Sequence, residues 1–220
     1  MKKMLLPAIL SICMSGAYGQ ETDAPLSRTI FKLSPQHFAQ NSLKAGVERF
    51  NQSHTGSVAI FLTGMMENKE QGFYGVGYDG LAGELQLRRY ISPMKMLTSK
   101  RNRVHHQGIY GAAYLQGGYY AGNFKGQSRD YDPVTGGFTW YEYDYRENIV
   151  NGGFGFTIGY QRTLWEVIFL EGFIGGGIQF SRSHYTGITG YADEFTGYDI
   201  SEPSYRGIQP KIGLNIGIGL

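Results

Sequence analysis

The last part of the chain alternates between apolar side chains and polar or very small ones. Between residues 205 and 220, every second position is apolar, in the series Ile208, Pro210, Ile212, Leu214, Ile216, Ile218 and Leu220. The positions between them hold Gly207, Gln209, Lys211, Gly213, Asn215, Gly217 and Gly219. A period of two predicts a β-strand with one apolar and one polar face. The run exceeds an average globular strand of about five or six residues and suits a tilted membrane strand of about nine to eleven.

Similar alternation recurs in seven segments upstream. They comprise residues 27–34, 42–50, 57–65, 81–91, 108–120, 153–161 and 166–180. After the N-terminal segment no run of about 18 to 20 apolar residues occurs, so a membrane location requires a closed barrel. An even strand number is expected for such barrels and places both ends on the periplasmic side. We therefore predict an all-β fold, an eight-stranded antiparallel up-and-down transmembrane β-barrel.

The connections agree with this orientation. Residues 51–55 and 162–165 are predicted as short periplasmic turns, and residues 122–149 and 181–204 as long surface loops rich in acidic residues and tyrosine. Residues 92–107 are long and basic for a periplasmic turn. The charged connections are read either as solvated faces or as binding surfaces.

A soluble, lipocalin-like periplasmic barrel is the alternative architecture. It would bury the apolar face of the last strand and leave the glycine-rich face in water. Aromatic residues near the predicted strand ends favour the membrane form, because they resemble interfacial girdles. These residues are Phe50, Tyr90, Tyr119, Tyr120, Trp165 and Phe180.

The N-terminal segment has the features of a signal peptide over residues 1–19. Lys2 and Lys3 precede an apolar stretch, and a small-x-small site predicts cleavage after Gly19, leaving residues 20–220 as the barrel domain in the cell outer membrane. A lipoprotein signal using Cys13 is the alternative, although Ile12 is large for a lipobox. Cys13 is the one cysteine, so the mature chain has no disulfide or thiolate metal site. Without Lys2 and Lys3, Lys+Arg falls from 20 to 18 and equals Asp+Glu, so no nucleic-acid partner is predicted.

Seven charged residues fall on the inward faces of the predicted strands. They are Lys32, Lys44, Glu48, Glu84, Arg88, Glu171 and Lys211. Side chains just fill the interior of an eight-stranded barrel, and buried charges must be paired. Four positive and three negative charges therefore predict a salt-bridge network that plugs the lumen, with a proton or ion path as the alternative.

Motifs that indicate chemistry are weak. The G-x-G-x-x-G string from Gly75 to Gly80 is followed by a predicted strand instead of a helix, and the S-x-x-K string at Ser92 lacks its companion motifs. The adjacent pair His105 and His106 would point to opposite faces of a strand. We predict no cofactor and no metal site.

One enzymatic alternative is a lipid A-modifying hydrolase or acyltransferase. Ser181, Ser183 and His184 follow a predicted strand, and Asp193 or Glu194 would orient the histidine. Otherwise the chain is predicted not to be an enzyme.

Several segments resemble a family of small outer-membrane β-barrels of unknown function from Gram-negative bacteria, with the eight-stranded OmpA/OmpX-like architecture. The resemblance includes Phe31-Lys32-Leu33-Ser34-Pro35, residues 42–49, residues 80–90, residues 108–120 and the last strand. The chain departs from many such barrels by ending in Leu220 instead of an aromatic residue. The resemblance implies fold and location, with outer-membrane lipid, lipopolysaccharide and the barrel-insertion machinery as partners.

The predicted function is a structural or surface-interaction role for a barrel with a plugged polar lumen and acidic, tyrosine-rich extracellular loops. A narrow pore for small solutes or ions is the alternative to this closed barrel. No extracellular ligand is identified.

Overall fold

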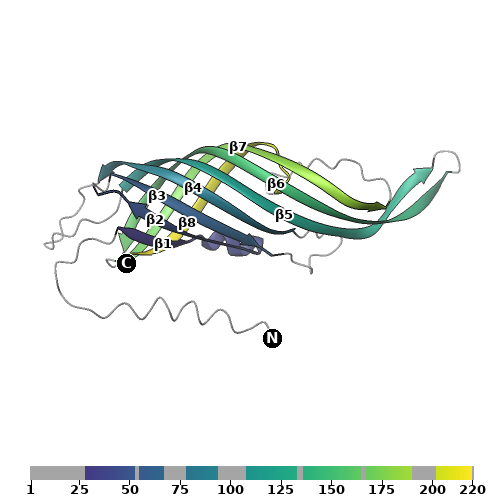
Figure 1. The fold of residues 1–220 in the computed structure, drawn as a ribbon, viewed down its shortest axis with the longest axis horizontal. Coiled ribbons are helices and arrows are strands. Elements are labelled where there is room, and N and C mark those ends of the chain that lie inside the picture. Colours follow the sequence, from purple (N-terminus) through teal and green to yellow (C-terminus); the bar gives the residue numbers. More distant parts are fainter. Residues whose placement is uncertain are drawn as a thin grey trace, which may run out of the picture.

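Eight antiparallel strands form a closed ring in a computed structural model of the chain, which describes residues 28–52, 55–66, 78–93, 108–132, 136–164, 167–189 and 202–219. Each strand pairs with its neighbour in sequence, and β1 pairs with β8 to close the barrel (Figure 1). The elements are β1 (Thr29–Leu33), the 3-10 helix η1 (Pro35–Gln40), β2 (Ser42–Phe50), β3 (Gly56–Met65), β4 (Tyr78–Pro93), β5 (Gly108–Asp132), β6 (Gly137–Leu164), β7 (Ile168–Thr189) and β8 (Gly207–Gly219).

The eight predicted strands all occur, and the antiparallel all-β prediction is confirmed. Alternation also assigns their faces as predicted, because the apolar residues of β8 are exposed on the outside, with Ile208 at 75% and Ile212 at 78%. The polar alternate positions face inward, where Asn215 is buried. The described part of the chain has no helix that is long and apolar enough to cross a membrane.

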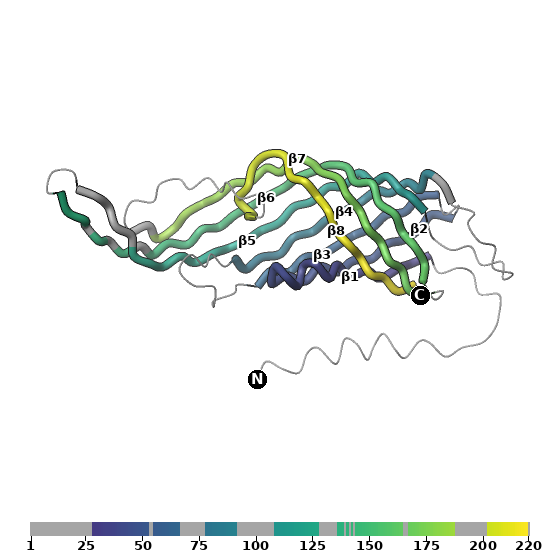
Figure 2. Tube along the Cα trace, turned by 180° about the vertical axis from the view of Figure 1, so that it is seen from behind, coloured from purple at the N-terminus to yellow at the C-terminus, as the bar shows by residue number. Residues whose placement is uncertain are grey.

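The long loop predicted over residues 122–149 is wrong. β5 and β6 instead continue as a hairpin, paired without interruption from Gly108 and Gln161 to Asp132 and Gly137. The loop predicted over residues 181–204 is likewise shorter, because β7 continues to Thr189. Both extensions mix charged, polar and aromatic residues, so hydrophobic alternation gives only a weak signal for them. Beyond β4 and β7 the hairpin stands alone as a two-stranded ribbon (Figures 1 and 2).

The predicted aromatic girdle is wrong for Phe50 and Tyr90. Both lie inside the barrel, with ring centroids 5.5 Å apart, in a buried cluster that also contains Ile30, Phe169 and Tyr110. Their positions share the inward parity of Glu48 and Arg88, which decides the face. Two other predicted members do face outward, Tyr119 and Phe180. Tyr120 is partly buried, and Trp165 lies outside the described residues.

The ring is least regular where it closes. β1 has five residues and pairs with β8 only from Ile30 to Leu33, opposite Gly219 to Ile216. η1 follows, contacts both β2 and β8, and ends at Asn41 in the left-handed conformation (φ 49°). Figure 2 shows β8 diverging from β1 away from the C-terminal end, with η1 at the far end of β1. The predicted signal peptide over residues 1–19 lies outside the described residues.

Candidate functional site

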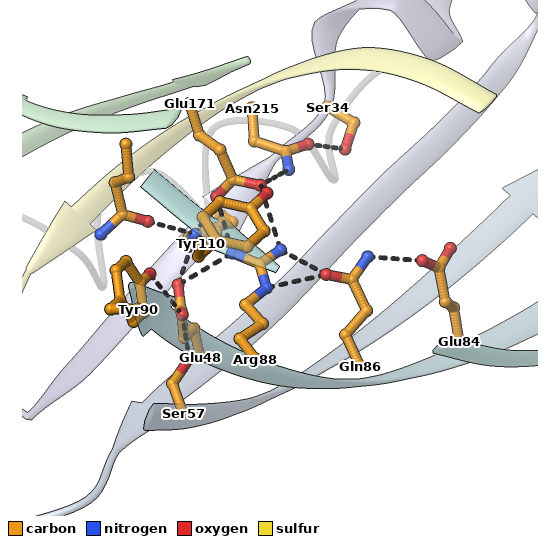
Figure 3. A network of polar contacts seen from close by, with 12 residues as sticks. Ser34, Glu48, Ser57, Glu84, Gln86, Arg88, Tyr90, Tyr110, Glu171 and Asn215 are labelled. Carbon is orange, nitrogen blue, oxygen red and sulfur yellow. Dashed lines mark hydrogen bonds and ion pairs between the residues drawn. The ribbon is translucent and has the colours of Figure 1, made fainter. Parts of the chain in front are cut away.

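A polar network crosses the lumen, and each of the eight strands contributes at least one residue to it (Figure 3). The eight residues, from β1 to β8, are Lys32, Glu48, Ser57, Arg88, Tyr110, Gln161, Glu171 and Asn215. We call this set the central network. Every contributor occupies an inward position of its strand, so the period-two pattern of eight separate segments converges on one cross-section of the barrel.

Two cations and two carboxylates form the charged centre of this network. Lys32 forms ion pairs with both Glu48 and Glu171. Arg88 lies 2.8 Å from Glu171 and 3.3 Å from Glu48. The side chains are at most 1% exposed, so each charge has lost its water and depends on its partners. The charges balance, which is the condition under which such a buried group is tolerated.

Neutral side chains satisfy the remaining polar atoms. Tyr110 donates a hydrogen bond to Glu171 (2.6 Å), and Tyr90 donates one to Glu48 (3.0 Å). Lys32 donates to Gln161 (2.7 Å). The guanidinium of Arg88 also stacks over the ring of Tyr110, 4.6 Å from its centroid. These contacts hold each charge in one position.

A second charged group, which we call the seam cluster, consists of Lys44, Glu84 and Lys211. Glu84 accepts from Lys44 (2.5 Å) and lies 2.9 Å from Lys211. Lys211 also donates to Gln116 (3.1 Å) and lies over the ring of Tyr114, 3.7 Å from its centroid. The ammonium groups of Lys44 and Lys211 share the one carboxylate of Glu84, so the seam cluster carries one surplus positive charge.

The structure therefore places all seven sequence-predicted residues in the lumen, in two groups. Gln86 connects the groups, because it donates to Glu84 (2.5 Å) and accepts from Arg88 (2.7 Å). Sequence reasoning did not include Gln86, Tyr90 or Tyr110 in the network. Gln86 follows the inward parity of Glu84 and Arg88 and was recognisable by that pattern, whereas an inward tyrosine has no charge to signal it.

Glu147 is a further inward carboxylate, although the sequence pattern assigned it to a surface loop. It is buried and accepts a hydrogen bond from Tyr78 (2.9 Å) at the end of the barrel from which the β5–β6 ribbon extends. Tyr185 on β7 lies opposite Glu147 in the register. Burial and the nearby Glu147 carboxylate raise the pKa of Tyr185 to about 12.

Ser183 and His184, two of the candidate enzymatic residues, do not converge. Ser183 and His184 are consecutive residues of β7, so one is partly buried while the other is exposed on the opposite face. Elsewhere, Nδ1 of His37 lies 3.2 Å from the hydroxyl of Ser42. That hydroxyl donates to the carbonyl of His37 (2.9 Å), so the imidazole does not take its proton and the pair links η1 to β2.

The other motif residues contribute no site to the described part of the molecule. Asp193, Glu194, His105 and His106 lie outside the described residues. Within the described ranges no group of three or more metal-ligating side chains occurs.

Comparisons with known proteins do not assign this chain to a family. No protein-family model, curated protein or solved structure matches the sequence or its fold.

Proposed function

We propose that this protein is an integral outer-membrane β-barrel with a plugged lumen and a surface-interaction or structural role. The observation that carries the proposal is the central network, which fills the lumen inside a ring whose outer face is apolar. A water-filled channel requires an open path through the lumen. Here side chains from all eight strands instead bond to one another across the lumen in one charge-balanced group.

The outer face supports the membrane location by its dimensions. On β4 the exposed apolar run lies mainly between Asp79 and Arg89, with Ile91 exposed beyond Arg89, and on β6 it lies between Asn148 and Arg162. These bounds enclose nine residues on β4 and thirteen on β6. A tilted membrane strand needs about nine to eleven residues, so the run on β4 matches the hydrocarbon thickness and the longer run on β6 is sufficient to cross it.

Arginines border this band at the end where β1 begins and β8 ends. Arg49, Arg89 and Arg162 are exposed on the outer face of β2, β4 and β6. Long cationic side chains at this depth extend along apolar surface and place their charge among lipid phosphates. If the protein were dissolved in water, the apolar band would be exposed over most of the ring. Such an apolar area is far larger than the patches that soluble monomers expose.

The same end of the lumen is also closed by apolar side chains. Phe50, Tyr90 and Phe169 are buried there beside Ile30. An ion would therefore have to displace an apolar cluster as well as the central network. Among the residues that the structure describes, no comparable contact supports the pore alternative.

The ribbon at the tip of β5 and β6 supports a surface role. Its outward face presents Phe138 at 57% exposure and Trp140 at 64%, next to the acidic residues Glu142 and Asp144. An isolated two-stranded ribbon gains little stability from water-exposed aromatic residues, whereas such residues are frequent at binding surfaces. We propose that the ribbon contacts an extracellular partner.

Planar-bilayer conductance tests the closed lumen. The purified protein should show no sustained single-channel currents, whereas Arg88→Ala combined with Tyr110→Ala should open a leak by removing the guanidinium and the ring beneath it. Sustained currents from the unaltered protein would contradict the plug. Membrane extraction tests the location, since release by carbonate without detergent would contradict an integral barrel.

A further inference from the structure

The edge of β8 is open over residues 208–214. The amide of Gly219 donates to Val167, so odd-numbered residues of β8 direct their backbone groups to β7 and even-numbered residues direct theirs to β1. The pairing with β1 ends at Ile216. The backbone groups of Ile212 and Leu214 therefore face an edge on which no described strand is paired. We call this opening between β8 and β2 the seam.

Two prolines keep the seam open. Continuing the β1–β8 register by two residues would place Pro35 opposite Leu214. Pro35 has no amide hydrogen to donate to that carbonyl, and it begins η1 instead. Pro210 is an even-numbered residue, so its missing donor also faces the seam, where a proline is tolerated because no strand partner is lost. The carbonyl of Ile208 is capped by the hydroxyl of Tyr205 (2.9 Å).

η1 lies in the seam and inserts a polar side chain beneath β8. A Cβ at Gly213 would clash with the ring of Phe173 and fall 2.7 Å from Nε2 of Gln36, so a larger residue there would require both side chains to move. Oε1 of Gln36 is buried without a hydrogen bond. Rotation of this amide would present its donor to a ligand at the same place.

The surplus charge of the lumen lies at this seam. Lys211 projects inward from the open stretch of β8, and Lys44 projects inward from β2 on the other side. Both share Glu84, so one positive charge has no carboxylate of its own. The carboxylates of the central network are already balanced by its own cations. Glu147 is too far away to pair with Lys211. Gln116, which accepts a hydrogen bond from Lys211, is paired with Gly153, and Glu147 lies six residues, about 20 Å of strand, from Gly153.

Apolar side chains surround the same opening on its outer face. Ile212 and Leu214 are exposed on β8, Leu43 on β2 and Phe38 on η1. A ligand seated here would meet cations at the lumen side and hydrocarbon-like surface at the lipid side. A ligand that has an anionic headgroup on an alkyl chain would fit both surfaces.

We propose that the seam binds a long-chain fatty acid, with its carboxylate between Lys211 and Lys44 and its chain directed outward past Ile212. The proposal rests on the membrane location proposed above. A carboxylate would supply the charge that Glu84 leaves unmatched. A single chain is assigned because β1 separates β8 from β2 by two strand spacings, about 10 Å, and η1 occupies part of that interval.

Photo-cross-linking in phosphatidylcholine nanodiscs tests the site. The probe is a long-chain fatty acid with a diazirine on its alkyl chain, and cross-linked peptides are mapped by mass spectrometry. Cross-links should concentrate on Phe38, Leu43, Ile212 and Leu214. Oleate should compete at least tenfold better than methyl oleate, which lacks the charge.

Lys211→Met should reduce the cross-linking yield at least tenfold. This change removes the surplus charge and leaves Lys44 and Glu84 as a balanced pair, so the barrel should still fold. The matched control is Lys125→Met, which removes an exposed lysine paired with Asp144 on the ribbon and should leave the yield unchanged.

Each other outcome overturns a defined part of the proposal. Cross-links spread evenly around the apolar band, or a yield insensitive to Lys211→Met, would overturn the seam site while leaving the membrane location intact. Stronger competition by phosphatidylglycerol than by oleate would overturn the assignment of a single-chain ligand. Failure of the protein to enter nanodiscs would contradict the membrane location itself.

Discussion

The central network and the seam cluster are built from the same residue types but differ in balance and enclosure. Lys32 and Arg88 face two carboxylates inside a complete ring of paired strands. Lys44 and Lys211 share one carboxylate beside the part of β8 that no described strand pairs. Complete pairing and balanced charge therefore occur together where the barrel is closed. The surplus charge occurs where the barrel wall is interrupted, which separates a structural region from a candidate binding region.

The largest effect is expected from breaking the central network. Arg88→Met leaves Glu48 and Glu171 with Lys32 as their one remaining cation in the network, so the free energy of unfolding should fall by about 3–5 kcal/mol. Urea unfolding followed by tryptophan fluorescence measures this change. The control is Arg89→Met, because Arg89 is adjacent in sequence but exposed on the outer face. Equal losses for both variants would show that burial in the network is not the cause.

Closing the seam should have a smaller effect in the opposite direction. Pro35→Val restores an amide donor opposite Leu214 and should add about 1 kcal/mol of stability for the new hydrogen bond. Fatty-acid cross-linking should fall about threefold in the same variant. Pro210→Val is the control, since no described strand lies opposite that position to accept the new donor. A stability gain for Pro210→Val that matched Pro35→Val would contradict the register argument.

Removing the surplus charge should change stability less than removing a balanced one. Lys211→Met loses the contacts with Gln116 and Tyr114 but leaves Glu84 paired with Lys44, so the expected change is about 1 kcal/mol or less. The same urea experiment compares it directly with Arg88→Met. A loss as large as that of Arg88→Met would indicate that the seam cluster is as structural as the central network.

The smallest effect concerns the outer end of the lumen. The pKa of Tyr185, about 12, lies above its ordinary value of 10.0, so the folded state favours the neutral phenol. Its contribution to stability is therefore fully present below pH 10 and is lost as the pH rises through 12. Glu147→Gln should lower the pKa of Tyr185, as measured by ultraviolet difference titration against Tyr185→Phe. An unchanged titration would show that burial alone raises the pKa.

Local alternation predicted much of the site but not its extent. Lys32, Glu48 and Arg88 were identifiable because each is a charged residue on the polar face of a strand with an apolar opposite face. Tyr110 was not, because residues 108–120 are rich in glycine and tyrosine and their two faces are similar in character. Glu147 was missed for a related reason, since the charged and polar residues around it resemble a loop, although it is paired with both Gly122 and Tyr185 inside the barrel.

The girdle prediction was wrong for Phe50 and Tyr90 because it rests on their positions near strand ends and not on the inward or outward alternation of each strand. Both residues follow the inward alternation of their strands, and an aromatic ring inside a narrow barrel fills volume that a charged network alone leaves open. Aromatic residues near strand ends therefore need the same face assignment as any other residue before they are placed at a membrane interface.

By itself, the sequence determined the number of strands, their inward and outward faces within the barrel and the seven charged residues of the lumen, because a β-strand repeats every two residues and this period is local. The tertiary structure decided which charges meet, because contacts across a closed barrel depend on strand stagger and bring together residues more than a hundred positions apart, as for Lys32 and Glu171. It also decided where the ring is interrupted. Pro35 and Pro210 lie far apart in the sequence, and only the pairing register of β1 with β8 places both at the same seam.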